Sequence, residues 1–154
     1  MLPDFDPTVT EFSIENAYVL MRACQATYSE DNDSYFARLA ELGIDGNDQE
    51  WIPLGHDACF VGWTDAWTVV AFRGTNNPGG WISNVYGSRP VSRPRLYYGK
   101  VHRGFDDGLE MLWEKLLETL ISPQAAGKPL FLTGHSRGGA LATLAAQRLH
   151  YEGI

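Results

Sequence analysis

A serine stands between two glycines in the segment GHSRG, residues 134–138. The segment fits the pattern Gly-x-Ser-x-Gly, in which a serine on a sharp strand-to-helix turn attacks an acyl group. Glycines suit the flanking positions, because side chains two residues from the serine would collide as strand and helix pack. A phosphate-binding loop would need a lysine directly after its last glycine, whereas Ala140 follows Gly139. The pattern favours Ser136 as a nucleophile over phosphate binding or a turn that only packs tightly.

The elements around this serine match what the pattern requires. The apolar run PLFLTG, from residue 129, predicts a buried strand, and the Ala- and Leu-rich segment after it predicts a helix from Arg137 to about His150. The first turn of such a helix offers backbone N–H groups and the positive end of the helix dipole. We therefore expect a strand, a nucleophile turn and a helix over residues 129–150, with an oxyanion held at the helix start.

Earlier segments predict the rest of an α/β domain. Apolar residues at helical spacing behind Ser13 predict a helix over residues 13–28, and a second helix is expected over 34–42. The β-rich runs ACFVGW and AWTVVAFRG flank Thr64-Asp65, which predicts a hairpin. Leucines at helical spacing predict an amphipathic helix over 109–120, after KVHRGF. Alternating strands and helices in the second half indicate a parallel sheet with crossovers.

Residues 75–100 are rich in Gly, Pro, Ser and Asn and are too long for an ordinary connection. Long loops in compact domains are commonly lids or disordered segments, and the apolar residues Trp81 and Ile82 argue against disorder. We expect a lid-like region. Trp81 would either anchor the loop to the body of the protein or meet lipid.

Composition limits the classes of partner. The chain has 154 residues and a formal net charge of −7, and its basic residues do not cluster, which excludes a nucleic-acid partner. We expect one domain over residues 1–154, two buried free thiols (Cys24 and Cys59), no transmembrane segment, and no metal or organic cofactor. The start of the chain lacks a signal pattern, which favours the cytoplasm; an incomplete N-terminus would leave secretion open. Oligomeric state stays open.

Three ordered segments carry a resemblance to a known family. VVAFRGTNNPGGWISN, GKVHRGF and LFLTGHSRGGALATLAA resemble the class three family of fungal-type lipases, over roughly Val69 to Leu149. The resemblance implies an α/β-hydrolase fold, with a mostly parallel sheet and flanking helices, of which this chain is the N-terminal part. The domain is therefore expected to be incomplete at its C-terminus.

The resemblance also implies roles for single residues. Ser136 would form an acyl-enzyme, and the backbone N–H groups of Thr75 and Arg137 would bind the oxyanion. Trp81 and Ile82 would belong to the lid or substrate region. Four further residues would support the site structurally: His102, Gly134, His135 and Gly138. Arg137 replaces an aliphatic residue common in the family, which suggests the hypothesis that its guanidinium favours esters with a polar or anionic part.

The partners that would activate the serine are missing from the sequence. In this fold the acid and then the histidine follow the nucleophile, and only His150 and Glu152 follow Ser136. Both belong to the helix that leads away, so we expect the triad Asp and His beyond Ile154. The predicted function is a serine hydrolase of carboxylic esters, with acylglycerols as the expected class, and the expected partners are a lipid or small ester substrate and a lipid interface. The alternatives are a truncated, non-catalytic lipid- or acyl-binding module and a complete hydrolase that uses His102 as base or takes a base from a partner chain.

Overall fold

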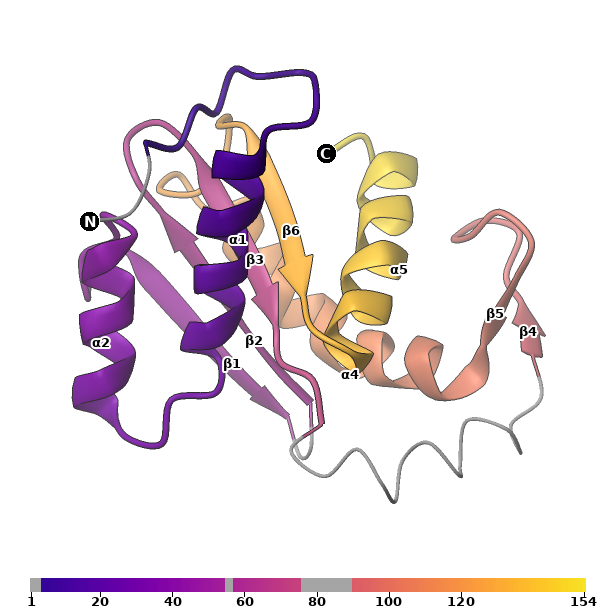
Figure 1. Ribbon diagram of the computed structural model, residues 1–154. Helices are drawn as coiled ribbons and strands as arrows, with labels where there is room; N and C mark the ends of the chain where they lie inside the picture. The colour runs from indigo at the N-terminus through magenta and orange to yellow at the C-terminus, as the bar shows by residue number, and fades with distance from the viewer. Residues whose placement is uncertain (1–3, 55–56, 76–89) are drawn as a thin grey trace.

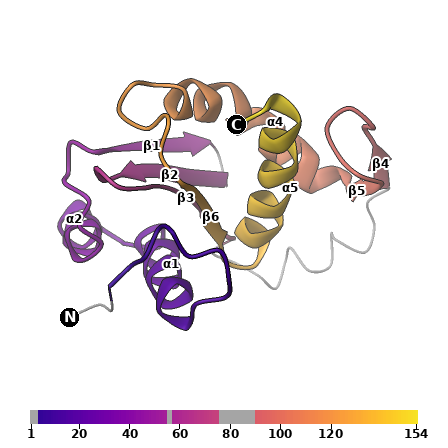
Figure 2. The ribbon, with the colours of Figure 1, turned by 90° about the horizontal axis from the view of Figure 1, so that it is seen from above.

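Three layers make up the fold in a computed structural model, which describes residues 4–54, 57–75 and 90–154. A four-stranded sheet forms the middle layer, and Figure 1 shows helices on both of its faces. Helices α1 (Ile14–Ala26) and α2 (Asn32–Glu41) cover one face. Helices α4 (Arg103–Leu120) and α5 (Arg137–Glu152) cover the other, as the view from above makes clear (Figure 2).

The described sheet is mixed, with the strand order β1-β2-β3-β6, and two of its three pairings are antiparallel, whereas a mostly parallel sheet was expected. Strands β1 (Gln49–Leu54), β2 (Asp57–Trp63) and β3 (Thr68–Phe72) are antiparallel neighbours, whereas β6 (Leu130–Gly134) runs parallel to β3. The predicted hairpin is β2–β3. Within the described residues only one pairing is parallel, because short connections permit only antiparallel partners and the long crossover through α4 permits the parallel one.

The strands differ in burial according to their place in the sheet. All five residues of β3 are buried, as expected for a central strand. The residues of β6 are only half-buried, because β6 forms an edge of the described sheet, so the expectation of a buried strand was wrong. Strand β1 was not anticipated and forms the opposite edge. Its Pro53 is tolerated there because proline has no N–H to donate to a further strand.

Helix boundaries follow their capping side chains. Ser13 Oγ accepts from Asn16 N at 3.1 Å and begins α1 as predicted, although α1 ends at Ala26, two residues early. The Asp31 carboxylate accepts from Ser34 N at 2.7 Å, which begins α2 two residues before the predicted start. His102 caps α4, so that helix begins inside the KVHRGF segment and earlier than its leucine pattern indicated.

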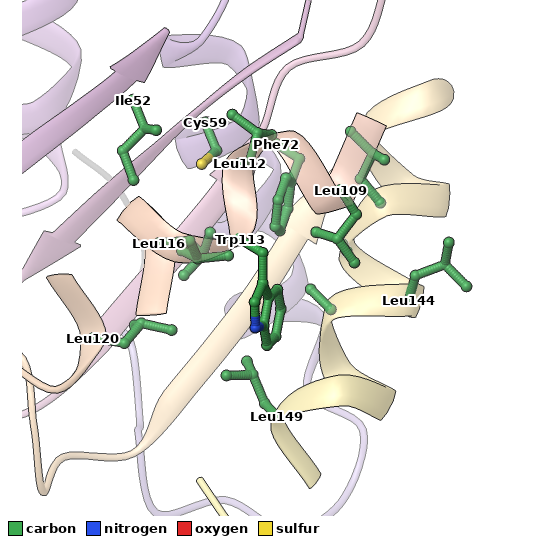
Figure 3. Close-up of a cluster of buried hydrophobic side chains, with 14 of the residues drawn as sticks. Ile52, Cys59, Phe72, Leu109, Leu112, Trp113, Leu116, Leu120, Leu144 and Leu149 are labelled. Carbon is green, nitrogen blue, oxygen red and sulfur yellow. The ribbon is translucent and has the colours of Figure 1, made fainter. Parts of the chain in front are cut away.

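Apolar side chains on the α4 and α5 face hold the helices to the sheet (Figure 3). Phe72 from β3 lies among Leu109 and Leu112 of α4, and each of these three side chains is essentially fully buried. Burial of one such side chain stabilises the fold by roughly 1.5–3 kcal/mol. Cys24 and Cys59 are buried free thiols, as expected, and burial raises the pKa of Cys59 to about 12.

A second, small sheet follows the central one in sequence. Strands β4 (Pro90–Ser92) and β5 (Lys100–His102) form an antiparallel hairpin, and the buried Tyr97 lies between them in sequence. Tyr97 Oη donates to Asp106 Oδ1 at 3.0 Å, and Arg93 Nε lies 2.7 Å from Asp106 Oδ2. The last part of the expected lid-like region is thus fixed to α4. Trp81 and Ile82 lie outside the described residues.

Candidate active site

The turn between β6 and α5 holds Ser136 in an unusual backbone conformation. Its φ of 56° and ψ of −120° make it the only non-glycine residue with positive φ in the described part of the chain. Such a conformation costs on the order of 1–3 kcal/mol and persists only where the surrounding structure enforces it. The Ser136 side chain makes no capping hydrogen bond to α5, although the residue stands at the N-cap position.

The two glycines of the motif permit this turn because they have no Cβ. A Cβ on Gly134 would overlap the backbone of Gly138 and lie 2.7 Å from Gly139 N. A Cβ on Gly138 would overlap Phe72 O and lie 2.8 Å from Phe72 C. These positions therefore allow the start of α5 to press against the ends of β6 and β3, and Ser136 is held above the sheet between them.

The end of β3 lies beside the serine turn. Phe72 pairs with Gly134 in the parallel register, so residues 73–75 continue past the sheet edge that carries Ser136. A Cβ on Gly74 would overlap His135 O, which shows how closely the two segments approach. Thr75 and Ser136 both line a cavity of about 670 Å³. The cavity's other lining residues are Thr27, Tyr28, Ser29, Glu30, Arg73 and His135.

Tyr28 connects the two segments, which the sequence pattern did not indicate. Its hydroxyl accepts from Gly74 N at 2.9 Å and shares a hydrogen bond with His135 Nδ1 at 3.2 Å. Burial raises the pKa of Tyr28 above its ordinary value, so the phenol stays protonated near neutral pH. Helical spacing had assigned Tyr28 only to the apolar face of the first helix, and nothing local distinguishes it from Tyr18 on that face.

His135 points toward Tyr28, with the two rings edge to face at 6.1 Å between centroids. Its Nδ1 is occupied by the Tyr28 hydroxyl. The His135 ring thus contacts Tyr28, and its structural role at the site stays a prediction.

Arg137 and His102 meet at the start of α4. Arg137 Nη2 donates to Gly104 O at 2.9 Å, and its guanidinium carbon lies 5.7 Å from the Phe105 ring centroid. His102 Nδ1 accepts from Gly104 N at 3.1 Å. The Arg137 side chain is buried against α4 and is not among the described residues that line the Ser136 cavity. This position argues against the hypothesis that its guanidinium binds an anionic part of the substrate. Its backbone remains at the start of α5, next to Ser136.

The later acid and histidine lie far from the serine. His150 stands fourteen residues beyond Ser136 on the same chain, which places it roughly 21 Å away along the axis of α5. Glu152 Oε1 accepts from Trp113 Nε1 at 3.1 Å, on the α4 side of the helix. Neither residue reaches the Ser136 hydroxyl.

The described residues carry neither a metal cluster nor a membrane-spanning helix. No group of three or more His, Cys, Asp or Glu within residues 4–54, 57–75 and 90–154 is arranged to hold a metal ion. No helix in that part of the chain combines the length and apolar character needed to cross a bilayer.

Comparison with solved structures identifies the fold. The triacylglyceride lipase of Rhizomucor miehei superposes with a TM-score of 0.62 at 24% identity, over 88% of this chain and 53% of that one. A fungal lipase–inhibitor complex gives a TM-score of 0.59 at 23% identity, over 88% and 54% of the two chains. The expected α/β-hydrolase fold, with helices on both faces of the sheet, is confirmed. A strained serine above such a sheet is typical of the serine hydrolases of this fold.

Comparison of sequences identifies the family. The family model described as lipase (class 3) matches residues 69–154, more than half of the chain. A Caenorhabditis elegans lipase is 32% identical over 86 residues, and the Rhizomucor miehei lipase is 35% identical over 83 residues. The matched segments span 56% and 53% of this chain but only 24% and 23% of those two proteins. The chain belongs to the class 3 lipase family, and the predicted resemblance is confirmed.

Proposed function

We propose that this chain carries the nucleophile of a lipase-type serine hydrolase acting on carboxylic esters. The carrying observation is the strained turn at Ser136, which opens into a cavity shared with Thr75. Strain of this kind is maintained by Gly134 and Gly138, whose Cβ positions are filled by neighbouring backbone. The family's relatives named as lipases support the same reaction class.

The proposed reaction follows from what each group can do. Ser136 Oγ adds to the ester carbonyl carbon, its proton passes to a base, and the base returns the proton to the departing alcohol. Water then hydrolyses the acyl-enzyme, releasing the carboxylic acid and restoring the serine. Backbone N–H groups of Thr75 and Arg137 stabilise the oxyanion, and Arg137 adds the positive end of the α5 dipole. By analogy with the family, the proposed substrates include acylglycerols.

The base and its acid are proposed to lie beyond Ile154. His135 Nδ1 bonds to Tyr28, His102 Nδ1 accepts from the first turn of α4, and His150 lies far along α5. These three histidines therefore have positions or partners that suit structural roles better than proton transfer from Ser136.

Labelling with a fluorophosphonate probe tests the proposal. In the longest form that the gene encodes, we expect one adduct at Ser136, located by mass spectrometry and absent in Ser136→Ala. The matched control is Ser29→Ala, which removes another serine of the same cavity and should keep the adduct. No adduct, or an adduct elsewhere, would overturn the nucleophile assignment. An adduct at Ser136 in the 154-residue chain alone would overturn the placement of the base beyond Ile154.

A further inference from the structure

Arg73 stands where the substrate cavity meets a second, smaller one. It directly follows β3, and its backbone N donates to Ala58 O at 2.8 Å, which fixes the start of its side chain. The side chain lines the cavity that contains Ser136 and also an adjoining cavity of about 270 Å³, bordered by Tyr35 and Trp51. The two cavities share Arg73 with three other residues: Thr27, Ser29 and Glu30.

The Arg73 guanidinium is held in place without a counter-charge. Its central carbon lies 5.9 Å from the Trp51 ring centroid, a distance typical of a cation–π contact. Its Nε is buried and has no hydrogen-bond partner. Among the described residues no acceptor or carboxylate binds its terminal nitrogens either. Since only Nε is fully buried without a partner, the terminal nitrogens are the part that a ligand in the cavity can reach.

Five other arginines of the described residues bind protein groups. Acceptors or carboxylates contact the side chains of Arg22, Arg38, Arg93, Arg137 and Arg148. Among the described residues the side chains of Arg95 and Arg103 also lack such contacts, but both are exposed, whereas Arg73 is half-buried beside the proposed nucleophile in a chain whose net charge is −7. Asp31 and Glu30 are the carboxylates of the two linings; Asp31 caps α2, and Glu30 is exposed.

We propose that Arg73 forms an anion-binding subsite beside Ser136, so that the preferred ester carries a phosphate or carboxylate group. This inference rests on the proposed ester hydrolysis and names its substrate class. The planar guanidinium matches the paired oxygens of phosphate and carboxylate, and partial burial strengthens the attraction. It also moves the expected recognition of anionic esters from Arg137, whose guanidinium binds Gly104 O, to Arg73.

Equilibrium binding of small probes tests the subsite by calorimetry on the 154-residue chain at low salt. We expect hexyl phosphate to bind at least about tenfold more tightly than hexan-1-ol, because a hydrogen bond to a charged group contributes that much or more. Arg73→Gln should abolish this preference, and Arg73→Lys should keep part of it. Arg95→Gln, which removes an equal charge from an exposed position, should leave it unchanged.

A second variant acts in the opposite direction and leaves Arg73 intact. Glu30→Gln removes from the cavity lining a negative charge that repels the phosphate group, so hexyl phosphate should bind a few times more tightly. This variant keeps the test decisive if Arg73→Gln fails to fold, because unchanged or weaker binding in it would contradict an anion held in this cavity.

Three results would overturn the proposal. Hexyl phosphate could bind no better than hexan-1-ol, or equally well to folded Arg73→Gln. Inorganic phosphate could bind as tightly as hexyl phosphate, which would indicate a site for free anions instead of an ester subsite.

Binding of hexyl phosphate does not require an activated serine, so the subsite and the proposed hydrolase can fail separately. Hexyl phosphate bound through Arg73 in a protein that never labels at Ser136 would therefore contradict the proposed hydrolase and keep the anion subsite.

Discussion

The two sides of the Ser136 cavity are built on different physical grounds. On the nucleophile side, residues 134–138, the position of each backbone atom follows from close contact, because no Cβ fits at Gly134 or Gly138. On the strand-end side, residues 73–75 with Tyr28, Gly74 also lies close to His135 O, but a polar contact joins the segments as well: the Tyr28 hydroxyl accepts from Gly74 N and shares a hydrogen bond with His135 Nδ1.

This difference predicts how each side fails. Closely packed backbone leaves no room for a partial adjustment, so a methyl group added on the nucleophile side must displace a strand or a helix. A hydrogen bond can be lost while the backbone stays near its place, at a cost of about one bond. Gly134 and Gly138 on the nucleophile side should therefore tolerate no added side chain, whereas loss of the Tyr28 hydroxyl on the strand-end side should cost about one hydrogen bond.

The largest expected effect comes from Gly138→Ala. The new Cβ would overlap Phe72 O at the end of the central strand, so we expect the free energy of unfolding to fall by roughly 3 kcal/mol in urea denaturation. Gly46→Ala is the matched control, because the nearest atoms to its Cβ are ring carbons of Phe36 at 3.4 Å and 3.5 Å. If both variants unfolded at the same urea concentration, the packing account of the nucleophile side would be wrong.

A smaller effect is expected for Tyr28→Phe. Removing the hydroxyl leaves Gly74 N–H without its partner, so stability should fall by roughly 1–2 kcal/mol and the Gly74 amide should exchange with solvent about tenfold faster. Hydrogen exchange followed by NMR measures this directly. Tyr35→Phe, which removes a hydroxyl bonded to Gln49 Oε1 at 2.8 Å, should not change exchange at Gly74. Unchanged exchange in Tyr28→Phe would show that the strand end is held by packing.

The same difference explains what could be predicted from the sequence. Gly134, Ser136 and Gly138 lie within five residues of one another, so local spacing was enough to locate the turn between a strand and a helix. Tyr28 binds Gly74 and His135, which lie 46 and 107 positions later in the sequence. No short sequence pattern can indicate contacts over such separations. Arg73 was visible in the sequence, but its lack of a partner depends on which side chains the folded chain brings near it.

Fold elements divide in a similar way. Strand β3 was predicted as part of a hairpin because it contains the continuous apolar run VVAF, which is typical of a buried strand. Strand β1 was missed because an edge strand that contains Pro53 lacks both a continuous apolar run and a regular alternation. The helix expected over residues 109–120 began too late, since its first turn is set by the His102 cap and not by leucine periodicity.

The smallest effect concerns pH and should be confined to the strand-end side, whose cavity lining continues into the α1–α2 connection. Hydrogen bonds from Ser34 to the Asp31 carboxylate hold its pKa below the ordinary value. A carboxyl group whose pKa is lower in the folded state stabilises the fold above its unfolded pKa, and this contribution is lost as the pH falls below about 4. Asp31→Asn cannot titrate, so its urea midpoint should decline less than that of the unmodified chain between about pH 4 and pH 2. Asp65→Asn removes an equal charge from the exposed β2–β3 turn and serves as the control. If Asp31→Asn declined as steeply as the unmodified chain, the Asp31 cap would contribute nothing to holding this side of the cavity.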